Sequence, residues 1–401
     1  MKNKFPIFIH HPYLIYLDAA ATTQRPQIVL DAIDAYYTQY NANTGRGVYQ
    51  LAETATQKIE DVRNQIAQFI GAADASEIVF THGTTESINL VAQSWALKNI
   101  KPGDEILVTG YEHHANFIAW QQLCKRIGAS FKVIPVDQSG QLLINSISDW
   151  VTPKTKLVAI THVSNALGFT NPYLNQLIMA ANQVGSRVLI DGAQAVKCLP
   201  IDVQSLNCDF YAFSGHKMYG PTGVGVLYVK KSVQQEMVPF CFGGGSVGSV
   251  TPIETAFLPF PHGYEPGTLP IAQIIGLGAA ITFIQSIGIK TLQEHANQLI
   301  NQLLDGLSQF NQIKVLGSQE LLRTTGTLVS FTIDGVHPHD VAAFLDTHNI
   351  CVRAGHHCAQ PLAQFMGYDA SIRVSFGVYN NQKDVNMLIQ TLEKLFKSNL
   401  L

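Results

Sequence analysis

Short apolar runs alternate with longer stretches of helical periodicity over the first two thirds of this 401-residue chain. Two runs, LVAITHV (157–163) and VLI (188–190), are continuously apolar, as in strands buried on both faces of a parallel sheet. The alternation therefore predicts an α/β fold with a mostly parallel, helix-covered sheet. The seven expected strands are 77–80, 105–108, 131–136, 157–163, 187–190, 210–213 and 224–229.

The last third of the chain has a different pattern. After FGGGS (242–246) and a proline-dotted stretch comes a long helical pattern, and strand character returns in TLVSFTI (327–333) and IRVSF (372–376). The final apolar residues have helical spacing behind Asn381, which suits an N-cap. We expect a large domain at residues 16–265 and a smaller α+β domain made of residues 1–15 and 266–401.

Composition narrows the possible partners. With 46% hydrophobic residues the chain can bury a substantial core. The net charge of -3 includes no basic stripe, so no nucleic acid is expected. The longest apolar run, near 274–284, is shorter than the roughly 20 residues of a membrane-spanning helix, so no membrane is expected either.

The cysteines and the N-terminus indicate the compartment. The six cysteines show no CxxC pair and no regular spacing, so neither a disulfide framework nor a metal site is expected. The first residues show no export signal. A reducing, cytoplasmic compartment is the prediction. The cysteines are at positions 124, 198, 208, 241, 351 and 358.

A candidate reactive lysine lies in FYAFSGHKMYGPTGVGVLYV (210–229), where Ser214, His216 and Lys217 occupy a tight loop between two apolar strands. A desolvated lysine has a lowered pKa and can form an imine with an aldehyde. Ser214 and His216 could then hold a phosphate. The alternative for a single lysine is an ordinary surface residue.

A candidate carboxylate ends the strand VLID at Asp191, and small residues and Gln194 follow. A buried aspartate needs a cationic or hydrogen-bonding partner. The protonated ring nitrogen of pyridoxal 5'-phosphate (PLP) would supply one, and protonation makes that ring an electron sink. The alternative is an aspartate that caps a helix.

Two more segments follow strands. GTTESINLVAQSW (83–95) opens a helix, which points the amides of Thr84 and Thr85 at an anion; an ordinary threonine N-cap is the alternative. In YEHHANF (111–117), either His113 or His114 could lie face to face with a flat ring, or be a hydrogen-bonded core histidine.

The segment VRAGHHCAQP (352–361) contains a candidate nucleophile, Cys358, with the positive charge of Arg353 nearby to favour the thiolate. Inert, buried packing is the alternative for a single cysteine. Arg353 and Arg373 suit the carboxylate of an amino acid, and a surface ion pair is the alternative for each.

Together, SGHKMYGPTG, DGAQ, GTTESINLVA, EHHAN, THVSN and RAGHHCAQP resemble the cysteine desulfurases of the class V aminotransferase fold, specifically the SufS-like group that includes selenocysteine lyases. The similarity runs from about Tyr16 to the last helix. It implies a PLP-dependent transferase of fold type I that is a homodimer. It also implies conversion of L-cysteine to L-alanine, with sulfur held as a Cys358 persulfide for iron-sulfur cluster assembly.

The resemblance leaves the substrate and the acceptor open. L-selenocysteine remains an alternative substrate, because it presents the same α-amino carboxylate. The short spacing between Arg353 and Cys358 is similar to the short catalytic loop of the SufS-like group, which implies a separate sulfur-acceptor protein as partner.

The resemblance also implies residue roles. Lys217 is the Schiff-base lysine and proton carrier, His113 stacks on the ring, and Asp191 pairs with its nitrogen. Arg373, together with Asn165, is the expected site for the substrate carboxylate, and Arg353 shapes the Cys358 loop. The implied cofactor contacts are Thr84, Thr85, His113, Asn165, Asp191, Gln194, Ser214, His216, Lys217 and, from the other subunit, Thr268.

Two departures and two rival functions accompany the resemblance. Gly45 stands where family members typically have a histidine before the Arg-Gly pair, and GTLP (267–270) stands where GTP is usual. Another lyase of the fold or a kynureninase-like hydrolase would not need Cys358. A non-catalytic scaffold would need neither Cys358 nor Lys217, so the intact motifs favour the desulfurase.

Overall fold

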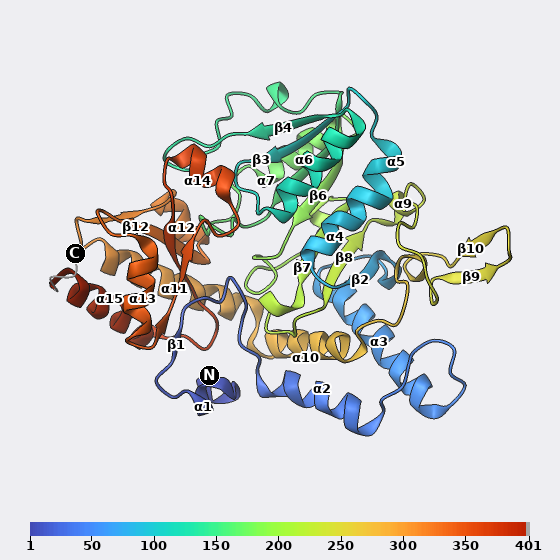
Figure 1. Ribbon diagram of the computed structural model, residues 1–401, viewed down its shortest axis with the longest axis horizontal. Helices are drawn as coiled ribbons and strands as arrows, with labels where there is room; N and C mark the ends of the chain where they lie inside the picture. The colour runs from blue at the N-terminus through green and yellow to red at the C-terminus, as the bar shows by residue number, and fades with distance from the viewer. Residues whose placement is uncertain (398–401) are drawn as a thin grey trace.

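The computed structural model describes residues 1–397 and contains the expected seven-stranded sheet (Figure 1). Its strand order is β2-β8-β7-β6-β5-β3-β4, with β8 antiparallel to both neighbours and the remaining neighbouring pairs parallel. All seven predicted strands and the mostly parallel sheet are confirmed. The strands are β2 (Ile78–Thr81), β3 (Glu105–Thr109), β4 (Ser130–Ile134), β5 (Thr155–Thr161), β6 (Arg187–Asp191), β7 (Phe210–Ser214) and β8 (Gly225–Val229).

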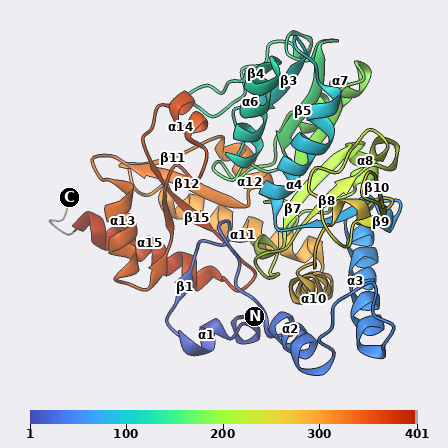
Figure 2. The ribbon, with the colours of Figure 1, turned by 45° about the vertical axis from the view of Figure 1, so that its right-hand side comes forward.

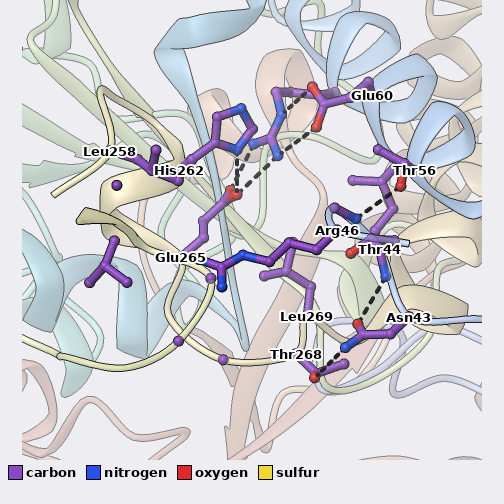
Figure 3. A pocket seen from close by; sticks show the side chains of 18 residues that line it. Asn43, Thr44, Arg46, Thr56, Glu60, Leu258, His262, Glu265, Thr268 and Leu269 are labelled. Carbon is purple, nitrogen blue, oxygen red and sulfur yellow. Dashed lines mark hydrogen bonds and ion pairs between the residues drawn. The ribbon is translucent and has the colours of Figure 1, made fainter. Parts of the chain in front are cut away.

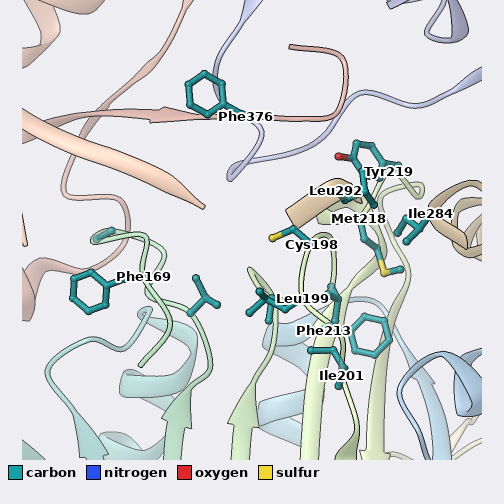
Figure 4. Close-up of a cluster of buried hydrophobic side chains, with 14 of the residues drawn as sticks. Phe169, Cys198, Leu199, Ile201, Phe213, Met218, Tyr219, Ile284, Leu292 and Phe376 are labelled. Atoms are coloured by element: carbon teal, nitrogen blue, oxygen red, sulfur yellow. The ribbon is translucent and has the colours of Figure 1, made fainter. Parts of the chain in front are cut away.

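Side chains alternate between the two faces of this sheet, and each face has its own core. In β3, Ile106 and Val108 join the cluster under helices α4 and α6, whereas Leu107 joins the cluster on the opposite face. Figure 4 shows part of that second cluster, where Phe213 and Met218 lie near the helix residue Ile284. The helices beside the sheet are α2 (Gln27–Gln39), α3 (Gln50–Phe69), α4 (Thr84–Val91), α5 (Leu97–Asn99), α6 (Ala115–Ile127), α7 (Leu174–Gln183), α8 (Val203–Leu206), α9 (Lys231–Gln234) and α10 (Ile271–Ile287).

A second, antiparallel sheet has the order β11-β12-β15-β14. It lies with the C-terminal helices to one side of the central sheet (Figure 2). The expected strands at 327–333 and 372–376 are present as β12 and β15. The elements are β11 (Ile313–Val315), β12 (Leu328–Ile333), β14 (Arg353–Gly355), β15 (Ser371–Ser375), α11 (Ile289–Leu307), α12 (Gln319–Thr325), α13 (Pro338–Asp346), α14 (Gln360–Met366) and α15 (Gln382–Lys397).

The two ends of the chain are tied into this smaller region. Strand β1 (Ile15–Tyr16) pairs in parallel with β13 (Ile350–Cys351). Asn381 accepts the backbone N–H of Lys383 at 2.9 Å through Oδ1, which confirms it as the N-cap of α15. The short elements are the helices at Lys2–Lys4 and α1 (Ile7–His10), and the hairpin of β9 (Val247–Val250) and β10 (Thr255–Phe257).

Helix α10 joins the two regions. It lies against α2 and α3, while α11 packs on α12 and α15 (Figure 1). Because this connecting helix packs on the large region, the chain shows no sharp break at residue 265. The domain boundaries at residues 15/16 and 265/266 stay a prediction. Within residues 1–397 no single helix is long and apolar enough to span a membrane; α10 and α11 meet that criterion only jointly, with a 76° bend between them.

A buried ion pair ties α3 to the segment that leads into α10 (Figure 3). The side chains of Arg63 and Glu265 are each 2% exposed, and their Nη1 and Oε1 atoms lie 2.7 Å apart. Arg63 also donates to the Ile78 carbonyl at 2.8 Å, and Glu265 accepts the Phe80 N–H at 2.7 Å. The pair thus fixes β2 at the edge of the sheet.

We expect Glu265→Gln to lower the free energy of unfolding by about 3–5 kcal/mol, because it removes the buried counter-charge of the Arg63 guanidinium and leaves it the part-exposed Glu60. Urea denaturation measures this change. Glu294→Gln is the control. Glu294 pairs with Lys290 at 3.9 Å on the solvent-exposed surface, and such pairs contribute about 0–1 kcal/mol to stability. Equal effects of the two substitutions would contradict the prediction.

Candidate active site

A cavity of about 240 Å³ lies where the strands of the central sheet end and the smaller region begins. Five segments that follow β2, β3, β5, β6 and β7 reach it, as expected for the carboxyl ends of parallel strands. Every predicted site residue except Thr268 is among its lining residues. The cavity is lined by Ala20, Ala21, Thr84, Thr85, His113, Ala115, Asn165, Asp191, Ala193, Gln194, Ser214, His216, Lys217, Arg353, His357, Cys358 and Arg373.

Lys217 ends the 3₁₀ turn Gly215–Lys217 that follows β7 directly. Burial lowers the pKa of its amine, and the negative charge of Asp191 opposes that shift. The turn thus places in the cavity a lysine whose lowered pKa favours the neutral amine, the form that can attack an aldehyde. The surface-lysine alternative is wrong.

Asp191 is the last residue of β6 and is buried. Its Oδ1 accepts the Ala193 N–H at 2.9 Å, and burial raises the pKa of the carboxyl while Lys217 lowers it. A cationic ring nitrogen would stabilise the ionised form further. Gln194 donates to the Ala20 carbonyl at 2.8 Å, and its Oε1 is buried without a partner among residues 1–397.

The start of α4 lines one end of the cavity. Thr84 donates its backbone N–H to Ser214 Oγ at 2.8 Å, and its hydroxyl lies 2.7 Å from the same oxygen. The N-cap residue of α4 is Gly83, which has no side chain to cap the helix. The threonine N-cap alternative is therefore wrong. A Cβ at Gly225 would lie 2.4 Å from the Gly83 Cα, and a glycine there lets β8 pass under this loop.

The two histidines that follow β3 have different places. His113 lines the cavity, and its Nδ1 accepts the Ala115 N–H at 3.1 Å. Burial, followed by the positive charge of Lys217, lowers its pKa to about 3. The ring is therefore neutral at neutral pH, which suits stacking on a heteroaromatic ring. His114 does not line the cavity and instead contacts the Cys358 loop.

Arg353 and Arg373 lie directly opposite each other on β14 and β15, and both bind Asp18. Arg373 is 3% exposed; its Nη2 lies 3.2 Å from Asp18 Oδ1, and its Nη1 donates to the Asn165 carbonyl at 2.9 Å. Arg353 Nε lies 3.2 Å from Asp18 Oδ2. Asp18 therefore offsets the repulsion of two like charges. Burial excludes a surface pair for Arg373.

Sequence reasoning missed Asp18 and Glu112. Asp18 pairs with arginines more than 330 positions away, a distance that no local pattern reports. Glu112 is buried beneath His113, and burial raises its pKa to about 8. Its carboxyl accepts from Thr109 Oγ1 and Asn116 Nδ2, both at 2.6 Å. A carboxylate beside the histidine pair was the available signal.

Cys358 is exposed at the cavity, so the inert-packing alternative is wrong. Its φ is +56° and that of His357 is +55°, a left-handed conformation that non-glycine residues adopt only at a cost. The side chain of Asn165 donates to the His357 carbonyl at 2.6 Å. Asn165 thus holds the cysteine loop as well as lining the cavity.

Thr268 lies in a different hollow of about 690 Å³ (Figure 3). Its hydroxyl accepts from Asn43 Nδ2 at 3.3 Å, and Gly45 and Arg46 line the same hollow. One chain therefore does not bring Thr268 to Lys217. The predicted phosphate contact across two subunits stays a prediction.

The sheet order, the lysine after β7 and the carboxylate at the end of β6 define the class as a PLP-dependent enzyme of fold type I. The chain belongs to the aminotransferase class-V family, which matches residues 15–388. A probable cysteine desulfurase of Halalkalibacterium halodurans is 45% identical over 397 residues, which cover 98% of this chain and 97% of that protein. The apo cysteine desulfurase of Thermococcus onnurineus NA1 has a TM-score of 0.94 at 38% identity, covering 99% and 97% of the two chains.

PLP is the cofactor of this class, and the cavity fits it. The C–S lyase C-DES, with a TM-score of 0.84, 25% identity and 98% coverage of both chains, was solved with glycine covalently linked to its PLP. Lys217 would supply an amine for the aldehyde, Asp191 a carboxylate for the ring nitrogen, and the Thr84–Ser214 pair hydroxyls for the phosphate. The resemblance to cysteine desulfurases is confirmed, and the SufS-like subgroup stays a prediction.

We expect borohydride to fix PLP to Lys217 and to no other lysine. The matched control is Lys197, which is buried, has no hydrogen-bond partner among the described residues, and has its pKa lowered to about 8 by burial. Lys197 does not line the cavity. After reduction and denaturation, wild type and Lys197→Ala should retain PLP by mass spectrometry, and Lys217→Ala should not. Attachment at Lys197 would contradict this assignment.

Proposed function

We propose that the chain converts L-cysteine to L-alanine and that Cys358 takes the sulfur as a persulfide. The observation that carries the proposal is an exposed cysteine that lines the same cavity as Lys217 and Asp191. The substrate C–S bond breaks, an S–S bond forms to Cys358 Sγ, and one thiol hydrogen ends in the methyl group of alanine. No external oxidant or reductant is needed.

The residues of the cavity divide this work. Lys217 holds PLP and then moves a proton at the substrate α-carbon, while Asp191 keeps the ring nitrogen protonated and His113 covers the ring. When bound, PLP supplies a sink for the electron pair left at that carbon. Arg373 binds the substrate carboxylate through charge-assisted hydrogen bonds, and its burial excludes competing water.

The other cofactor contacts belong to the proposal as well. Thr84, Thr85, Ser214 and His216 hold the phosphate, and burial lowers the pKa of His216 to about 4, so it acts there as a neutral group. Gln194 contacts the ring hydroxyl, and Arg353 shapes the Cys358 loop from β14. Asn165 lies beside the ring and ties that loop to the cavity.

The wider role is part of the same proposal. We propose a SufS-like enzyme, a cytoplasmic homodimer, that supplies sulfur for iron-sulfur cluster assembly through a separate acceptor protein. The exposure of Cys358 supports transfer to an acceptor, and the free thiols among the described residues support a reducing compartment. The position of Thr268 outside the cavity supports completion of the site by a second subunit. L-Selenocysteine remains an alternative substrate.

A C–S lyase is the second candidate, favoured by the structural similarity to C-DES. Such an enzyme would use Lys217 and Asp191 in the same way but would not need a cysteine in the cavity. Cys358 therefore decides between the two functions.

We expect Cys358→Ala to reduce alanine formation from L-cysteine to background while the PLP absorbance band stays, because none of the proposed cofactor contacts involves Cys358. Alanine and sulfide are assayed with wild type and with Cys241→Ala, which removes another exposed thiol that lies outside the cavity. Sulfide formation that survives in Cys358→Ala would favour the lyase. A wild type without a PLP band would overturn both candidates.

A further inference from the structure

The loop that carries Cys358 adopts a conformation that its own residues do not favour. Two successive non-glycine residues, His357 and Cys358, have φ values of +55° and +56°. Only contacts with neighbouring segments can keep such a backbone in place. These contacts also fix the position of the sulfur relative to the cavity.

One residue binds the backbone of this loop at the nucleophile and two residues after it. His114 donates its backbone N–H to the Cys358 carbonyl at 2.7 Å. Its ring Nε2 accepts the backbone N–H of Gln360 at 3.2 Å. The two hydrogen bonds flank Ala359, which directly follows Cys358, so this part of the loop cannot move away from His114 without breaking at least one of them.

His114 is itself well anchored. It directly precedes α6, and its carbonyl accepts the Ile118 N–H at 2.8 Å within the first turn of that helix. An amide N–H can only donate, so Nε2 must be the unprotonated nitrogen of a neutral ring. Burial and the nearby His356 lower the pKa of His114, which favours that form.

We propose that His114 is a positioning residue that clamps the Cys358 loop and holds the sulfur at the cavity. His114 does not line the cavity, so the proposed role is exerted through the loop. The inference rests on the proposed function, because it assigns the clamp a role in the attack of Cys358 on the substrate sulfur.

Side-chain length and hydrogen-bonding capacity give a graded set of variants. His114→Ala removes the ring acceptor and keeps the backbone bond. His114→Asn is too short to reach the Gln360 N–H, whereas His114→Gln carries an acceptor oxygen at similar reach. Gln122→Ala is the matched control. Gln122 lies on α6 and lines a surface groove together with His114, but among residues 1–397 its side chain donates to Gln121 and not to the Cys358 loop.

The test uses the PLP-loaded enzyme and two readouts. The first is the rate of Cys358 alkylation by iodoacetamide without substrate, followed by mass spectrometry of the Cys358 peptide. The second is kcat and KM for alanine formation. We expect His114→Ala and His114→Asn to change the alkylation rate severalfold and to lower kcat about tenfold or more, with KM within about threefold of wild type. His114→Gln and Gln122→Ala should stay close to wild type.

Each other outcome overturns the clamp. Wild-type kcat in His114→Ala means that the loop needs no clamp, and a loss of kcat with unchanged alkylation means that His114 acts by another route. If His114→Ala fails to fold, the Asn and Gln pair decides, and equal behaviour of that pair contradicts the proposal. Failure of the proposed function is recognised separately, by a wild type that forms no alanine or by full turnover in Cys358→Ala.

Discussion

Parallel strands in one sheet end at one edge, and the candidate active site depends on this constraint. Segments far apart in the sequence meet in the cavity because β2, β3, β5, β6 and β7 all direct their carboxyl ends to it. Thr84, His113, Asn165, Asp191 and Lys217 follow these strands directly or within a short loop. The smaller sheet then closes the cavity with the cysteine loop and the two arginines.

Burial of charge decides what this cavity can bind. The guanidinium groups of Arg353 and Arg373 line the cavity, while burial keeps the cavity histidines neutral. The two guanidinium groups suit an amino-acid carboxylate. Asp18 keeps the arginines in place before a ligand binds, since like charges opposite each other on neighbouring strands repel.

The sequence predicted the strands and most of the cavity residues because these signals are local. Apolar runs identified all seven central strands, and residues just after the strands identified Lys217 and Asp191. Partners across long separations could not be predicted in the same way. Asp18 binds Arg353 and Arg373 only because β1 pairs with β13 beside the smaller sheet, and His114 could be separated from His113 only when the Cys358 loop was placed.

The central claim is that Cys358 accepts the sulfur of L-cysteine. The most direct measurement is the mass of the Cys358 peptide after a single turnover of the PLP-loaded enzyme with one equivalent of L-cysteine, in the absence of reductant. The account predicts one added sulfur atom on Cys358 and an equal amount of alanine. Release of free sulfide with pyruvate, while Cys358 stays unmodified, would contradict it.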